Sequence, residues 1–188
     1  MADWLELCKL ALDGFGRRVH AIDDWHAPTP DTEWDVSDLV RHVIVEQQWV
    51  RPLAAGLSLE EAAKQVPDVG ADLAAEWERY AAEAITAWAG APADGQVNLS
   101  YGVVSVGYYL REMVCDAAIH TWDLARAIGA DEILDAAVVE AVWDETQPKL
   151  EMLAASGMFA APVAIGDDAS RQDRLLALTG RDPRQALA

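Results

Sequence analysis

The apolar and polar positions along this chain follow a mainly helical pattern. Over residues 3–23 an apolar side chain returns every three or four positions, as on the buried face of an amphipathic helix. Pro52 and Gly56 are expected to end the helix that begins near residue 35, Ser58 and Glu61 form a predicted capping box, and Gly129 is expected to stop the helix over residues 103–128. The pattern predicts long helices over residues 3–23, 35–50, 70–89, 103–128 and 135–155, and short helices from Ser58 to about Pro67 and from Ser170 to just before Thr179.

The segments between these helices contain typical loop residues. Residues 25–35 include Pro28 and Pro30 and are predicted to form a loop, as are residues 90–101, while residues 159–166 favour a short extended piece. Long helices with connections of medium length predict an all-α fold: a four-helix bundle with short additional helices and a small C-terminal extension, in a single domain over residues 1–188. Metal sites in such bundles are commonly built from side chains on facing helices.

The most informative run is residues 115–129, because it carries Asp116 and His120 one helical turn apart. Side chains at positions i and i+4 lie on one helix face, roughly 6 Å apart, and a divalent cation can bridge them. His42, the inward-facing histidine of the helix predicted over residues 35–50, is the best candidate for a third ligand. Two imidazoles and one carboxylate leave coordination positions open, which is typical of a working metal site.

Other polar side chains share the helix face of this pair. At 100° per residue Tyr109, Glu112, Asp116, His120 and Asp123 fall within about 80° of the helix circumference, and apolar residues flank them. A polar stripe directed into a bundle is costly unless something satisfies it, and a metal ion with its water does so. The simpler alternative is a hydrogen-bonded pair at a partly buried surface.

The pattern suggests a role for each of the other residues on and beside this stripe. Tyr109 and Glu112 are candidate pocket residues; the alternatives are a core hydroxyl for Tyr109 and an exposed helix charge for Glu112. Asp123 is placed to hydrogen-bond a ligand imidazole and so to orient it. Cys115 lies about 100° around the helix from Asp116 and is interpreted as a core residue.

The helix that carries His42 adds three candidates around it. Glu46, one turn after His42, is a reserve fourth ligand or otherwise an exposed helix charge. Trp34 and Trp49 flank His42 in the sequence and could line the pocket.

Charge and composition exclude several classes of function. The formal net charge is −18, with 14 basic and 32 acidic residues, so the chain has no cationic patch for nucleic acid and is poorly suited to an anionic membrane surface. No apolar run reaches the roughly 18 residues of a membrane span, and the N-terminus has no signal-peptide pattern, which favours a cytoplasmic protein. Cys8 and Cys115 form no Cys-x-x-Cys motif, so neither a disulfide framework nor a zinc–thiolate site is expected.

Three segments, residues 38–42, 120–129 and 175–183, together resemble the DinB-like metal-binding superfamily. Within it the chain is most similar to the actinobacterial branch related to the N-terminal domain of mycothiol-dependent maleylpyruvate isomerase. The resemblance implies a four-helix bundle that binds a divalent metal, often zinc, with nickel and iron as alternatives. By motif the implied ligands are His42, Asp116 and His120.

The chain departs from these isomerases in two ways. They place a glutamate at the position of Asp116, and they carry a further C-terminal domain that contributes to the active site, whereas only residues 121–188 follow His120 here. The maleylpyruvate isomerase reaction is therefore not implied.

The resemblance also suggests a chemistry. Relatives use low-molecular-weight thiols such as mycothiol or bacillithiol, and a metal with open positions lowers the pKa of a bound thiol. Eleven arginines against three lysines, in an alanine-rich chain, fit an actinobacterial source that would contain mycothiol. We therefore expect a metal-dependent thiol S-transferase or thiol-assisted isomerase acting on a small electrophilic substrate, with a homodimer as one arrangement of the chain. The alternatives are a metal-dependent hydrolase and a non-catalytic, metal-stabilised binding or stress-response protein.

Overall fold

A computed structural model describes residues 2–31, 33–149 and 160–185. The predicted all-α bundle is confirmed, with one small hairpin added. In chain order the elements of the described residues are α1 (Trp4–Val19), α2 (Val36–Ala54), α3 (Leu59–Ala63), α4 (Leu73–Gly90), β1 (Gln96–Leu99), β2 (Gly102–Ser105), α5 (Val106–Ala127), α6 (Ala136–Thr146), the 3₁₀ helix η1 (Gln147–Lys149) and α8 (Arg171–Leu178).

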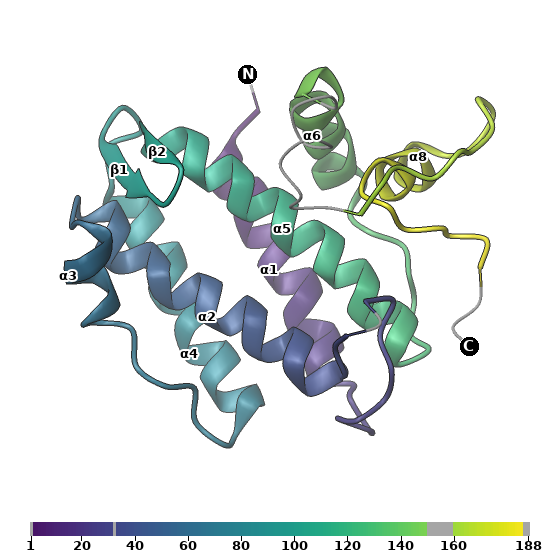
Figure 1. Cartoon of the computed structure of the whole chain (residues 1–188), viewed down its shortest axis with the longest axis horizontal. Helices are drawn as coiled ribbons and strands as arrows, with labels where there is room; N and C mark the ends of the chain where they lie inside the picture. The colour runs from purple at the N-terminus through teal and green to yellow at the C-terminus, as the bar shows by residue number, and fades with distance from the viewer. Residues whose placement is uncertain (1, 32, 150–159, 186–188) are drawn as a thin grey trace.

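The bundle consists of two closely packed helix pairs, α1 with α5 and α2 with α4. Figure 1 shows α5 crossing the centre of the molecule, with α6 and α8 together on one side of it. Phe15 and Trp122, which are 0% and 2% exposed, belong to the hydrophobic core, and the Phe15 ring on α1 lies 4.6 Å from that of Trp77 on α4. The contact between α2 and α5 joins the two pairs and positions the site described below.

Local signals in the sequence fix most helix ends. The Asp35 side chain accepts the backbone N–H of Asp38, whose carboxylate accepts the N–H of Asp35, so a capping box starts α2. The predicted box at Ser58 and Glu61 is confirmed for α3, and Ser170 caps α8 as expected. Beyond α5 the chain turns at Gly129 with φ of 64°, a left-handed conformation that favours glycine.

The prediction that Pro52 and Gly56 together end the second helix holds for Gly56 and is wrong for Pro52. Helix α2 continues to Ala54, and the chain turns at Gly56 with φ of 81°. A proline in the last turn removes only one backbone hydrogen bond, and both Pro52 and Leu53 gain burial by remaining helical. The burial of Pro52 and Leu53 therefore outweighs the loss of one backbone hydrogen bond.

The segment predicted as a loop over residues 90–101, and the first residues of the next predicted helix, contain a β-hairpin instead. Strand β1 pairs antiparallel with β2, in register from Gln96–Ser105 to Leu99–Gly102, so only two residues form the turn. The Ser105 side chain accepts the N–H of Tyr108 and starts α5 after the hairpin rather than at residue 103. The hairpin lies beside the N-terminal end of α5 (Figure 1).

The helix predicted over residues 135–155 and the predicted extended piece also differ from expectation. Helix α6 ends at Thr146 and passes into η1 at Pro148, while the rest of the helix predicted to residue 155 lies outside the described residues. Residues 160–166 form no strand, although the N–H of Val163 bonds to the carbonyl of Ala177 on α8; Phe159 is not described. Within the described ranges no helix is both long and apolar enough to cross a membrane.

Candidate metal centre

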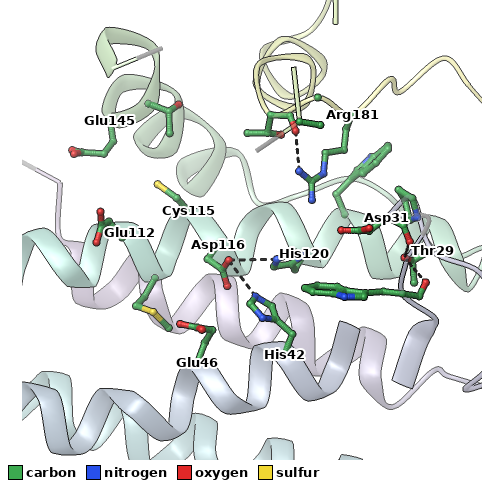
Figure 2. A pocket seen from close by; sticks show the side chains of 18 of the residues that line it. Thr29, Asp31, His42, Glu46, Glu112, Cys115, Asp116, His120, Glu145 and Arg181 are labelled. Carbon is green, nitrogen blue, oxygen red and sulfur yellow. Dashed lines mark hydrogen bonds and ion pairs between the residues drawn. The ribbon is translucent and has the colours of Figure 1, made fainter. Parts of the chain in front are cut away.

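Three candidate ligands from two helices meet where α2 faces α5. The Nε2 atom of His120 lies 3.4 Å from Oδ1 of Asp116, and Nε2 of His42 lies 3.7 Å from the same oxygen. One ligand atom from each residue lies within 4.8 Å of the other two. Figure 2 shows both imidazoles directed at the Asp116 carboxylate. The i, i+4 spacing on α5 and the inward face of α2 thus bring together a cluster that could hold a metal ion.

The second oxygen of Asp116 supports this interpretation. Oδ2 is buried and has no hydrogen-bond partner among the described residues. A buried carboxylate oxygen without a partner costs free energy that a bound cation would remove. Imidazole nitrogen and carboxylate oxygen are donors that zinc, nickel and iron(II) accept. The residues present therefore fit a divalent transition-metal ion.

Asp123 holds the His120 ring from the other side. Its Oδ2 lies 3.1 Å from Nδ1 of His120, and its side chain is only 1% exposed. A hydrogen bond at Nδ1 fixes a proton there and makes Nε2 the nitrogen that could bind a metal ion. The sequence predicts that Asp123 orients a ligand imidazole, and such a role requires a hydrogen bond of this kind.

The charges of the cluster are strongly coupled. Burial would lower the pKa of His120, but Asp116 and Asp123 outweigh burial and raise it to about 9. Burial opposes ionisation of Asp116, yet His120 and His42 hold the pKa of its carboxyl well below the usual value. Without a metal ion, the site therefore keeps a proton on His120 between two carboxylates, and a bound metal ion would displace that proton.

An aromatic side chain from the loop before α2 covers the two histidines. The Trp34 ring centroid lies 4.8 Å from that of His42 and 5.9 Å from that of His120. The Thr29 hydroxyl, which bonds to the carbonyls of Asp31 and Trp34, holds the loop in place. Trp34 therefore shields one side of the cluster from water.

The cluster lies in the wall of a large cavity, with a volume of about 1330 Å³. At one end the cavity is bounded by the loop around Asp31, and at the other by the hairpin residue Tyr101. Figure 2 shows Asp116 and the histidines between Asp31 and Glu112, and the Tyr101 hydroxyl donates a hydrogen bond to Glu112. The structure places the four predicted pocket residues in the wall, namely Trp34, Trp49, Tyr109 and Glu112. Glu46 also lines the cavity, and Asp123 lies behind His120.

Two glutamates near the cluster, Glu46 and Glu112, have raised pKa values. Burial, and then the charge of Asp116, raise the pKa of Glu46. Burial raises the pKa of Glu112, against the opposing effect of the Tyr101 hydroxyl, which donates a hydrogen bond to it. Glu46 does not belong to the group of mutually close ligand atoms, so its reserve role as a fourth ligand gains no support.

The remaining cysteine and histidine residues lie outside the cluster. Cys115 is buried as predicted, at 8% exposure, but it also forms part of the cavity wall, and burial raises the pKa of its thiol well above the usual value. His20 pairs with Glu78 at 3.2 Å, and His26 pairs with Asp35 at 2.9 Å.

Arg181 has no role predicted from the sequence, yet its guanidinium donates two hydrogen bonds to Asp123 and lines the cavity. The only signal was its position in the Gly180-Arg181-Asp182-Pro183 motif that contributed to the family resemblance.

Comparison with known proteins identifies the fold family. Residues 8–125 match the family model of the mycothiol maleylpyruvate isomerase N-terminal domain. The match covers more than half of the chain and contains His42, Asp116 and His120, but it ends before α6 and Arg181. Comparisons with curated proteins and with solved structures gave no significant match. The chain thus belongs to the family of the mycothiol maleylpyruvate isomerase N-terminal domain.

Proposed function

We propose that this protein is a metal-dependent enzyme that activates a low-molecular-weight thiol, with mycothiol as the leading candidate, for transfer to or isomerisation of a small electrophile. The observation that carries the proposal is the open wall position of the His42, Asp116 and His120 cluster. Structural zinc sites are closed by four protein ligands, whereas a site with three ligands beside a cavity keeps a position for a reactant.

A divalent ion bound here, zinc in the first instance, would act as a Lewis acid that lowers the pKa of a coordinated thiol. The protein's own groups supply the rest of the chemistry. Asp123 keeps Nε2 of His120 directed at the site, and Trp34 limits access of water from one side. Glu46, with its raised pKa, is the candidate base that takes the proton from the thiol sulfur.

The size of the cavity supports a reaction between two molecules. Pockets for one drug-sized ligand commonly have volumes of roughly 300–1,000 Å³. At about 1330 Å³ this cavity has room for a thiol and an electrophile at the same time, with the cluster between its ends. An attacking sulfur held near the electrophile gains from proximity as well as from ionisation.

Cobalt-substituted protein tests this proposal directly. Addition of mycothiol should produce a sulfur-to-cobalt charge-transfer band in the near ultraviolet. Asp116→Asn should weaken the band and the consumption of thiol with electrophiles together. Cys115→Ala should retain the band, because the sulfur comes from the added thiol.

Two results would contradict the hypothesis that an added thiol binds to the metal ion. If no low-molecular-weight thiol changes the cobalt spectrum, then metal-dependent hydrolysis, with Glu46 beside the cluster as the base for water, becomes the better hypothesis. If Cys115→Ala removes the band, the sulfur belongs to the protein.

A further inference from the structure

Arg181 reaches the candidate metal centre from outside the family domain. It follows α8, beyond the matched residues 8–125, and its side chain is only 13% exposed. Its Nε and Nη2 atoms donate to the two carboxylate oxygens of Asp123 at 3.1 and 2.8 Å, and Nη1 donates to the carbonyl of Thr179 at 2.8 Å. Figure 2 shows its guanidinium directed toward the cluster.

The Asp123 carboxylate depends on this partner. It is 1% exposed, and a buried charge is tolerated only when it is paired and hydrogen-bonded. The two parallel bonds from Arg181 fix the plane of the carboxylate as well as its charge. Because Oδ2 of Asp123 also meets Nδ1 of His120, the orientation of the carboxylate sets the orientation of the ligand ring.

The end of α8 determines where the Arg181 side chain points. The N–H of Gly180 bonds to the carbonyl of Ala177, and the N–H of Arg181 bonds to the carbonyl of Leu176, which is the hydrogen-bond pattern of a Schellman motif. Gly180 has φ of 82°, and an added Cβ would lie 2.5 Å from Cβ of Ala160, so a side chain at this position would be strained and would clash. Leu176, which is fully buried, anchors the helix.

We propose that Arg181 is a positioning residue for the metal centre, acting through Asp123 on His120. The C-terminal segment is then a working part of the site, although it lies outside the matched family domain. This inference rests on the metal centre of the proposed function, but it holds whether or not a thiol is the reactant.

Competition between the full-length protein and a chelator for Zn²⁺ tests the proposal. Arg181→Gln should bind Zn²⁺ 10- to 100-fold more weakly than the wild type, as is typical when the partner of a ligand histidine is disturbed. Arg181→Lys keeps the charge but cannot form the two parallel bonds, so its loss should be smaller. Arg184→Gln is the matched control: Arg184 is in the same segment but pairs with Asp182, so Zn²⁺ affinity should be unchanged.

A double-mutant cycle tests whether Arg181 affects Zn²⁺ affinity through Asp123. Because Arg181 acts through Asp123, the Arg181→Gln/Asp123→Asn double variant should bind Zn²⁺ no more weakly than Asp123→Asn alone. The visible spectrum of the cobalt-substituted variants should change with the affinity, since both report how His120 is held. If the losses of Zn²⁺ affinity in the two single variants add fully in the double variant, Arg181 does not act through Asp123, and the proposal is overturned.

The remaining outcomes separate this inference from the proposed function. Wild-type affinity in Arg181→Gln, with a wild type that binds Zn²⁺, overturns the role of Arg181 and leaves the metal centre intact. A wild type that binds no Zn²⁺ overturns both. If Arg181→Gln does not fold, as judged by circular dichroism, wild-type affinity in Arg181→Lys would refute the positioning role.

Discussion

Metal binding at this site should compete with a proton on His120. In the metal-free protein, Asp116 and Asp123 outweigh burial and raise the pKa of His120 to about 9. An imidazole can bind a metal only after it has lost the proton on the ligating nitrogen, so binding below about pH 9 releases one proton. The apparent affinity should therefore rise about tenfold per pH unit, by roughly 100-fold between pH 7 and 9, and then level off.

Competition against a chelator of known pH dependence, from pH 6.5 to 9.5, measures this slope. The variant Asp123→Asn removes one of the two charges that raise the pKa of His120, so its curve should level off at a lower pH. An affinity that is constant above pH 7 in the wild type would show that His120 has already lost its proton there, and would refute the electrostatic argument.

The same shift affects the stability of the metal-free protein. The folded state binds the proton on His120 more tightly than the unfolded chain, whose histidine pKa is about 6.5. This contribution to the free energy of unfolding, on the order of 3 kcal/mol, is fully present below about pH 6.5 and is lost as the pH rises through about 9. Chemical denaturation of metal-free protein at pH 6.5 and 9.5 should show the loss.

The remaining predictions concern the ligands and the scaffold. His120→Ala should lose most of the one metal ion expected per chain, as measured by elemental analysis, whereas His20→Ala, whose imidazole pairs with Glu78, should retain it; equal metal content in both would contradict the site. Phe15→Ala should lower the free energy of unfolding by about 3–5 kcal/mol in chemical denaturation, because the ring is fully buried against Trp77. Gly129→Ala, at φ of 64°, should cost about 1 kcal/mol in the same assay, and no loss would mean that the turn after α5 relaxes without strain.

Much of the bundle could be predicted because local signals and burial agree along most of the chain. The repeat of apolar positions, the capping box at Ser58 and the turn at Gly129 each depend on neighbouring residues alone. The approach of Asp116 to His120 follows from helical spacing, and that of His42 follows from the buried face of α2.

The features that sequence reasoning missed depend on distant contacts. Pro52 remains helical because its neighbours gain burial, and burial at that position is decided by the rest of the bundle. The hairpin had a local signal in the β-branched pair Val103-Val104 before the cap at Ser105, but helical periodicity from the following segment obscured it. Arg181 meets Asp123 only after α8 has packed against α6, so no spacing in the sequence reveals the pair.

The position of the cluster at the contact between α2 and α5 has a consequence for evolution. His42 belongs to the pair formed by α2 and α4, while Asp116 and His120 belong to the pair formed by α1 and α5. An ion bound to all three side chains would fasten the two halves of the bundle to each other, much as a covalent cross-link does. Selection for chemistry and selection for a durable scaffold would then act on the same residues. Proteins that descend from such a bundle could then change their substrates and their peripheral segments while the three ligand residues at the contact between α2 and α5 stayed the same.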